Sequence, residues 1–591
     1  MVDLRKSPYY LSDEDIMWVH CTIEKMTLDE KIGQLFVQMG ESGASEERIQ
    51  SLEENYHQGG LRYQGDTREP VADLIANYQK YAKLPLLVAS NCDNGGDGAY
   101  KGGTFVCSAA GAAASKSRDT AYQMGVVAAR EAGNVGCNWL FNPCVDILMN
   151  WRNTIVNTRC FGDTADGVIE NARAFIRGVH EGGLAVCCKH FPGDGEEELD
   201  QHLVLGTNNL SAEDWRASYG KVYEAMIEED IEGIMVGHFA QRALSREFVP
   251  GIRDEEIMPA TLSPELLQGL LRKELGFNGL VVTDASHMVG MTGAMARRDI
   301  LPAAIAAGCD LFLFFNDPDE DFGYMMDGYK NGVITEERLQ EALQHILGTK
   351  AHLGLHKKAK TDIMPPKDGL SVIGCKAHVD IAKQVSDLGI TLVKNVGKSP
   401  LPISPEKYKR ILIVTAGQKP NPMLTAMLGG GTKSAEELLR DTLTREGYEV
   451  EIFVSAAEKM AAAAAKGGDA MKNIMGMYAG KSSIEEFKAK YDLVIQVANV
   501  SFFGAPVQRL VFGMSKGGFE MPWYVHEVPV IFVSMNCPYH LADVPQVKTY
   551  INCYDAMDYT IDALVDKLSG RSAFKGVSPV DAFCGMVDAH I

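Results

Sequence analysis

A series of short apolar runs, each followed by a longer segment of helical periodicity, constrains this chain of 591 residues more than any other feature. Most of the runs are continuously apolar rather than alternating, which is typical of parallel strands buried on both faces. Eight such β–α units predict a (β/α)8 barrel of the TIM type, with a doubly wound open sheet as the alternative. The eight runs are Gln34–Gln38, Gly59–Tyr63, Pro85–Ser90, Cys137–Phe141, Ala185–Lys189, Gly233–Gly237, Gly279–Thr283 and Asp310–Phe314.

The length of the chain predicts two domains, because a single hydrophobic core rarely grows past about 250–300 residues. Segment 356–370 is basic, contains a Pro-Pro pair and has no period, so we expect a linker there. The expected layout is a catalytic barrel over residues 1–355 and an α/β sandwich domain over residues 371–591. Six strand candidates belong to the second domain: Gly389–Lys394, Ile411–Ala416, Tyr448–Val454, Asp492–Ala498, Pro529–Ser534 and Val547–Ile551.

The net charge and the cysteine pattern indicate which partners and which cellular compartment to expect. The formal net charge of −21 disfavours nucleic acid and anionic membranes as partners, because both attract basic surfaces. No signal-peptide pattern and no apolar run of about 18 residues occurs. The 13 cysteines show no CxxC spacing, which favours free thiols in a reducing compartment. We therefore expect a cytoplasmic protein that binds small molecules, with a homodimer left open.

Polar side chains follow the predicted strands at the same end, in strand after strand. Catalytic groups of a (β/α)8 barrel stand at the carboxyl ends of its strands. The candidates at these positions are Asp93, Arg159, Lys189, His190, Asp200, His202, His238 and Asp284. No HExxH zinc pattern, P-loop or GxGxxG after a strand is present, so we expect neither a metal nor a cofactor.

Three of these residues suggest proton transfer and nucleophilic attack. Asp284 ends an apolar run, where a carboxylate can attack an anomeric carbon; a helix N-cap is the competing role. Asp200 can orient His202 and keep it basic, so that the imidazole can shuttle a proton. An exposed and mobile loop would contain the same two residues, and it is the competing interpretation.

The other candidates suggest recognition of a polar ligand. Asp93 and Arg159 can bind hydroxyl groups in bidentate fashion, and Lys189 and His190 can donate hydrogen bonds to them. Structural salt bridges are the competing role for each of these residues.

Six motifs follow one another in a set order along the chain. Those of the first domain are Met26-Thr-Leu-Asp-Glu-Lys-Ile-Gly-Gln34, Asn142-Pro143-x-x-Asp146 with Arg159-x-Phe161-Gly162, Lys189-His190-Phe191-Pro192-Gly193-x-Gly195 with Asp200-x-His202, and Gly279-Leu-Val-Val-Thr-Asp284. Leu392-Val-Lys-Asn395 and Asn536-Cys-Pro-Tyr539 follow in the second domain. Over roughly residues 23–555 the chain resembles glycoside hydrolase family 3, and the third motif resembles its β-N-acetylglucosaminidase branch.

The resemblance implies roles for the candidate residues. It implies Asp284 as the nucleophile and His202 as the acid/base, held by Asp200. It also implies that the terminal sugar is bound by Asp93, Arg159, Lys189 and His190, with His238 as a weaker candidate. The chain departs from the family's pattern at Asp194, where this branch usually has histidine, at Glu196–Glu198, and at Ala285, where a second aspartate is common.

The expected function is a retaining exo-β-glycosidase that hydrolyses terminal β-N-acetylglucosaminides. The expected substrates are small amino-sugar glycosides, such as cell-wall muropeptide or chitin-type fragments. A β-glucosidase or β-xylosidase, a glycoside phosphorylase and an inactive sugar-binding protein on the same scaffold are the alternatives. Asp194 and Glu196–Glu198 lie close to His202 in sequence, and their negative charge would favour water over phosphate as the acceptor.

Overall fold

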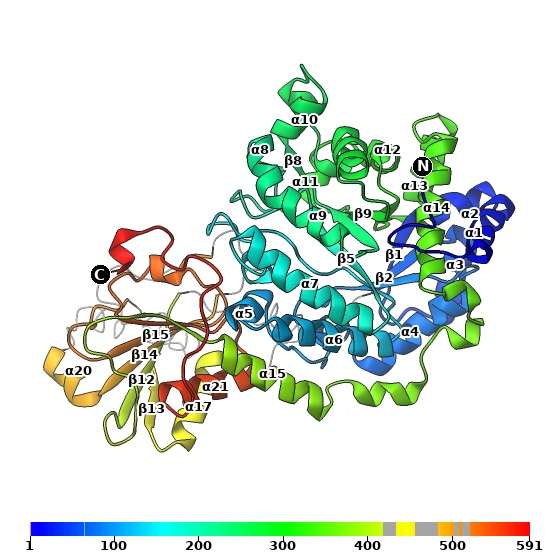
Figure 1. Cartoon of the computed structure of the whole chain (residues 1–591). Coiled ribbons are helices and arrows are strands. Elements are labelled where there is room, and N and C mark those ends of the chain that lie inside the picture. The colour runs from blue at the N-terminus through cyan, green and yellow to red at the C-terminus, as the bar shows by residue number, and fades with distance from the viewer. Residues whose placement is uncertain are drawn as a thin grey trace, which may run out of the picture. The chain divides into compact units, whose positions relative to one another are not determined.

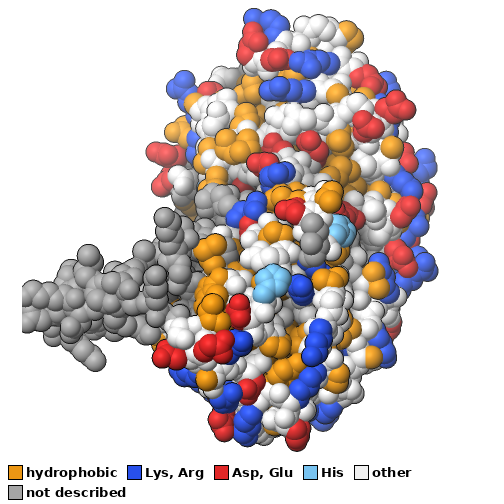
Figure 2. Space-filling model, turned by 90° about the vertical axis from the view of Figure 1, so that its left-hand side faces the viewer, with side chains coloured by type: hydrophobic (Ala, Val, Ile, Leu, Met, Phe, Trp, Pro, Cys, Tyr) orange, Lys and Arg blue, Asp and Glu red, His pale blue; other side chains and the backbone are white. Residues whose placement is uncertain are grey.

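The computed structural model describes residues 2–63, 65–417, 433–454, 483–500, 508–510 and 521–590. The chain divides into two compact units, one made of Met1–Ala109 with Ser117–Ile381 and the other of Ala110–Lys116 with Ala382–Ile591. Among the described residues, no helix is both long and apolar enough to cross a membrane. Lys and Arg side chains are interspersed with Asp and Glu over the face drawn in Figure 2.

Eight parallel strands of the first unit close into a barrel in the order β1-β10-β9-β7-β5-β4-β3-β2 (Figure 1). This closure confirms the predicted barrel and rules out the open sheet. The ring closes where β1 pairs with β10, with Phe36 opposite Phe312 and Val37 opposite Leu313. The strands are β1 Phe36–Gly40, β2 Gly60–Tyr63, β3 Leu87–Ser90, β4 Trp139–Leu140, β5 Ala185–Phe191, β7 Gly233–Val236, β9 Leu280–Ala285 and β10 Leu311–Leu313. A separate parallel pair joins β6 Gly206–Asn208 to β8 Phe239–Gln241.

Helices connect the strands, and several begin at a side-chain cap. Thr27, Ser45 and Thr335 each accept a hydrogen bond from the backbone three residues later, which satisfies one of the free N–H groups of the first turn. The α-helices of this part are α1 Asp13–Lys25, α2 Leu28–Gly33, α3 Glu46–Tyr56, α4 Arg68–Tyr81, α6 Arg118–Asn134, α7 Ala165–Glu181, α8 Ala212–Trp215, α9 Lys221–Ile227, α10 Arg242–Phe248, α11 Val289–Thr292, α12 Arg297–Ala307, α13 Pro318–Lys330 and α14 Glu336–His352. Helix α5 Ala109–Ala114 belongs, apart from its first residue, to the second unit.

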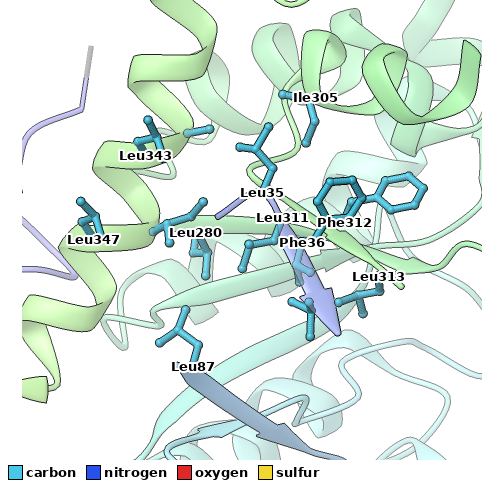
Figure 3. Packing of buried hydrophobic residues seen from close by; sticks show 14 of the residues in the cluster. Leu35, Phe36, Leu87, Leu280, Ile305, Leu311, Phe312, Leu313, Leu343 and Leu347 are labelled. Carbon is cyan, nitrogen blue, oxygen red and sulfur yellow. The ribbon is translucent and has the colours of Figure 1, made fainter. Parts of the chain in front are cut away.

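A large apolar core of the first unit lies between the barrel strands and the helices around them. In Figure 3, Leu343 and Leu347 of α14 lie on the side of the helix that faces Leu280 of β9, and all three are fully buried. The rings of Phe36 and Phe312 meet edge to face at the closing strand pair. Because the strands are covered on both faces, they carry continuous apolar runs instead of alternating ones.

The second unit contains a six-stranded sheet with the order β11-β16-β15-β14-β12-β13. Its pairs are parallel except β11–β16, and every strand candidate of the second domain is found as a strand. The strands are β11 Thr391–Asn395, β12 Arg410–Thr415, β13 Glu449–Ile452, β14 Leu493–Ala498, β15 Val530–Ser534 and β16 Thr549–Asn552. The described helices are α15 Lys376–Gly389, α17 Ala435–Arg445, α20 Ile484–Lys490 and α21 Asp558–Leu568.

Segment 356–370, the predicted linker, lies in the first unit. Its Lys367 pairs with Asp73 of α4 at 2.8 Å, and Arg68 donates to the Leu370 carbonyl at 3.1 Å. This part of the chain is therefore held against a barrel helix. The predicted boundaries at residues 355 and 371 stay a prediction.

The crossing of α6 and α7 provides a test of the packing. A Cβ added at Gly125 of α6 would stand 2.3 Å from the Phe175 carbonyl oxygen, so Gly125→Ala must push the helices apart. We expect a loss of about 1–3 kcal/mol, the usual cost of overpacking, seen as a lower midpoint of thermal unfolding. Gly323→Ala in α13 is the control, because nothing lies within 4 Å of the added Cβ, and it should stabilise by about 0.5–1 kcal/mol. Equal effects of the two substitutions would contradict this packing.

Candidate active site at the carboxyl end of the barrel

The eight candidate residues come together at the carboxyl end of the barrel. Asp93 follows β3, Lys189 and His190 lie in β5, His238 follows β7, and Asp284 lies in β9. Arg159 joins them from the loop after β4, and Asp200 and His202 from the loop after β5. Ion pairs join most of these residues directly. His202 contacts Asp200 and is close enough to Asp284 to lower the pKa of that carboxyl group.

Asp284 is a mostly buried carboxylate close to imidazoles. Its Oδ2 lies 3.8 Å from Nε2 of His190, and its Oδ1 accepts the backbone N–H of Ala285 at 2.7 Å. Burial alone would raise the pKa of Asp284, but electrostatic interaction with neighbouring imidazoles, His190 first, and the hydrogen bond from the Ala285 N–H outweigh burial and hold that pKa below its usual value. The carboxylate is therefore ionised at neutral pH, as a nucleophile at carbon must be.

Asp200 and His202 form a hydrogen-bonded pair. Nδ1 of His202 donates to Oδ1 of Asp200 at 2.7 Å, and the same oxygen accepts the backbone N–H of His202 at 2.9 Å. Burial alone would lower the pKa of His202, but the hydrogen bond to Asp200 and the charges of Asp284 and Asp200 raise it overall. With Nδ1 occupied, Nε2 is the nitrogen that can exchange a proton with a bound molecule.

Asp93 links the buried cation Lys189 to the partly buried cation Arg159. Its carboxylate lies 3.2 Å from Nζ of Lys189 and 3.5 Å from Nε of Arg159, and it accepts a hydrogen bond from Asn142. Burial would raise the pKa of Asp93, but Lys189 and Arg159 lower it to about 2. These groups combine a salt bridge with donors and acceptors arranged for hydroxyl groups.

Asp146 orients His190 from below the site. It accepts Nδ1 of His190 at 2.7 Å, the backbone N–H groups of His190 and Asp194, and the thiol of Cys144. The ring is thereby fixed with Nε2 toward Asp284. In the sequence, Asp146 is marked only by its place in the Asn142-Pro143-x-x-Asp146 motif, because its fully buried position behind His190 depends on the tertiary structure.

Cys144, Asp146 and His190 also lie close enough together to hold a metal ion. Their side chains already hydrogen-bond one another, however, and the thiol and the imidazole both donate to the carboxylate. The cluster is thus complete as a hydrogen-bonded group.

His238 is turned toward the protein. It is fully buried, and its Nε2 lies 3.1 Å from the Ala285 carbonyl while Nδ1 lies 3.0 Å from the Thr261 hydroxyl. The carbonyl can only accept, so Nε2 carries the proton and Nδ1 accepts from Thr261. Burial lowers the pKa of His238 to about 4, which keeps the ring neutral. Both ring nitrogens are thus occupied, and His238 holds the peptide after Asp284. A role of His238 in binding the sugar stays a prediction.

The acidic stretch before Asp200 is bonded to its own loop. Glu197 accepts the backbone N–H of Thr207 and Glu196 that of Asn209, while Glu198 lies 3.6 Å from Arg152. The loop expected to be mobile is therefore tied to its own returning segment. Burial raises the pKa values of Asp194 and Glu197 to about 7, so these two carboxyl groups carry less than full charge at neutral pH.

Comparison with known proteins identifies a family and several relatives. The model of the glycosyl hydrolase family 3 N-terminal domain matches residues 27–349. A protein from Cellulomonas fimi named β-N-acetylglucosaminidase/β-glucosidase is 38% identical over 592 residues, covering 100% of both chains. A β-hexosaminidase from Idiomarina loihiensis is 29% identical over 42% of this chain and 73% of its own length.

Among solved structures, one named β-glucoside phosphorylase BglX has a TM-score of 0.89, with 38% identity over 99% of both chains. A family 3 β-N-acetylglucosaminidase from Paenibacillus has the same fold, with a TM-score of 0.75 and 24% identity over 94% of this chain and 99% of its own. The fold and the matched family are those of glycoside-cleaving enzymes. The chain belongs to glycosyl hydrolase family 3.

The ion pairs of Asp93 predict a specific stability loss. Asp93→Asn would leave the almost fully buried Lys189 without its counter-ion, at a cost of about 3 kcal/mol. Asp73→Asn is the control, since its pair with Lys367 is exposed and should change stability by less than about 1 kcal/mol. Denaturant unfolding of the three proteins at pH 7 measures both values. Equal losses in the two variants would show that the Asp93 pairs do not stabilise the site.

Proposed function

We propose that the protein is a retaining exo-β-glycosidase that removes terminal β-linked N-acetylglucosamine, with Asp284 as nucleophile and His202 as acid/base. One observation carries the proposal: an ionised carboxylate and an imidazole anchored by Asp200 occupy the same end of the barrel and influence each other's pKa. A double displacement needs one group that attacks the anomeric carbon and a second group that donates and then accepts a proton.

In the first step, a carboxylate oxygen of Asp284 attacks the anomeric carbon as Nε2–H of His202 protonates the departing oxygen. The glycosidic bond breaks and a glycosyl ester on Asp284 forms. His202 is then neutral, and it takes the proton of the acceptor that attacks the same carbon and releases the sugar. Two displacements at one centre return the original configuration.

The terminal sugar would be bound by Asp93, Arg159, Lys189 and His190. The first three are joined by ion pairs, and His190 lies beside Asp284. The names of the relatives support an acetamido sugar, and the double name of the Cellulomonas protein keeps glucose as the alternative. Small amino-sugar glycosides of muropeptide or chitin type remain the proposed substrates. All 13 cysteines are free thiols, which supports the proposed cytoplasmic location.

Phosphorolysis is the second candidate, and two observations favour it. A chain with 38% identity over nearly its whole length is named a phosphorylase. In addition, the loop carboxylates expected to repel phosphate are bonded to backbone or arginine, and two have pKa values near 7. Hydrolysis therefore stays a prediction, with less electrostatic support than the sequence suggests.

Replacing the nucleophile tests the covalent step. Asp284→Asn should keep the fold and lose about four or more orders of magnitude in turnover, because the amide cannot form the ester. A 2-fluoro-sugar with a good leaving group should label a peptide that contains Asp284, as mass spectrometry would show. The exposed Asp299→Asn is the control and should be fully active. Near-normal turnover of the Asp284 variant would rule out the assignment.

Product analysis tests the sugar and the acceptor. We expect a higher kcat/KM on the nitrophenyl N-acetylglucosaminide than on the glucoside, with free sugar as the product in buffer without phosphate. Equal values on the two substrates would remove the acetamido preference. A sugar 1-phosphate as main product at millimolar phosphate would establish the second candidate in place of hydrolysis.

A further inference from the structure

Gln201, the residue between Asp200 and His202, joins the loop of the acid/base pair to the end of β7 and to helix α11. Its Oε1 accepts the backbone N–H of His238 at 2.6 Å, and its carbonyl accepts the backbone N–H of Gly290 at 2.9 Å. We infer that Gln201 is a positioning residue that clamps His202 in place relative to Asp284. This inference rests on the roles proposed above for Asp284 and His202.

Hydrogen bonds of Asp200 fix the turn that contains Gln201. The Asp200 carbonyl accepts the N–H groups of Leu203 and Val204, and the Asp200 carboxylate holds His202 through both its ring and its backbone. With both neighbours bonded in this way, the position of Gln201 determines the position of the His202 imidazole.

Further hydrogen bonds connect Gln201 and His202 to the segment that contains Asp284. The His238 ring holds the Ala285 carbonyl next to Asp284, while the His238 backbone N–H is held by Gln201. The His202 carbonyl also accepts the N–H of Val289, in the segment that follows Asp284. A short series of hydrogen bonds therefore connects the acid/base to the nucleophile.

Two further observations support a positioning role for the contacts of Gln201 with His238 and Gly290. A Cβ at Gly290 would stand 2.5 Å from the His238 carbonyl oxygen and 2.9 Å from that of Gln201, so the segments approach as closely as only glycine permits. Nε2 of Gln201 is buried without a partner among the described residues, where a polar group costs stability. An apolar side chain would avoid that cost, but it could not bind the His238 N–H.

The test compares substrates that need a proton donor with substrates that do not. Misplacing a catalytic group by about 1 Å can cost about 100-fold in rate, so Gln201→Met should lower kcat/KM on poor leaving groups by about 10–100-fold. Dinitrophenyl glycosides leave without protonation and should change by no more than a few-fold. The assays use the whole chain in buffer without phosphate.

Gln79→Met is the matched control. Gln79 is as buried as Gln201 and also bonds backbone, at Leu86, but at the opposite end of β3 from the site. Its replacement should lower stability and affect good and poor leaving groups equally. If Gln201→Met also affects both classes equally, or neither, the clamp is refuted.

Gly290→Ala tests the same contact if Gln201→Met does not fold, because the added Cβ pushes the segments of Gln201 and His238 away from Gly290. We expect the same loss on poor leaving groups. Equal losses on both substrate classes in that variant, relative to wild type, would also refute the clamp.

His202→Ala distinguishes a failure of the clamp from a failure of the proposed acid/base. If it too is indifferent to the leaving group, the proposed acid/base fails. A selective loss in His202→Ala with none in Gln201→Met or Gly290→Ala refutes the clamp alone.

Discussion

The pairing of β1 with β10 is the constraint on which the site depends. It converts eight parallel strands into a ring, and in a ring of parallel strands all carboxyl ends lie on one rim. Asp93 follows β3 and Asp284 lies in β9, which are far apart in the sequence, yet both side chains reach β5, where Lys189 and His190 contact them. An open sheet with the same strands would spread these loops along an edge. The apolar filling between strands and helices, including the Phe36–Phe312 contact, stabilises this closed form.

Within the rim, the balance between burial and neighbouring charge separates the carboxyl groups into two kinds. Burial raises the pKa of each one. Asp93, Asp146 and Asp284 lie beside Lys, Arg or His side chains whose charge outweighs burial, so their pKa values are lowered. In the described part of the chain no cation lies as close to Asp194 or Glu197, and burial raises their pKa values to about 7. The site therefore combines permanently ionised carboxylates with others that are partly neutral near pH 7.

The loop after β5 shows how hydrogen bonds can turn an acidic, glycine-containing stretch into a fixed element. The carboxylates of Glu196 and Glu197 bind backbone N–H groups of the returning segment, so their charge serves the loop's own conformation. Asp200 does the same around His202. The number of acidic residues near His202 in sequence is thus a poor measure of the field that an incoming acceptor would meet.

The sequence by itself determined the barrel, the second α/β unit and the set of polar residues at the rim. Apolar runs report burial on both faces of a strand, and the residue after each run must lie at its carboxyl end. The direction in which each side chain points could not be predicted in this way. His238 follows β7 as the other candidates follow their strands, yet its ring binds Thr261 and Ala285 behind the site. Asp146 and Gln201 act on the site from buried positions that no spacing reveals. Only the tertiary structure decided these roles, because they depend on hydrogen bonds between segments that are distant in sequence and meet only after the barrel has closed.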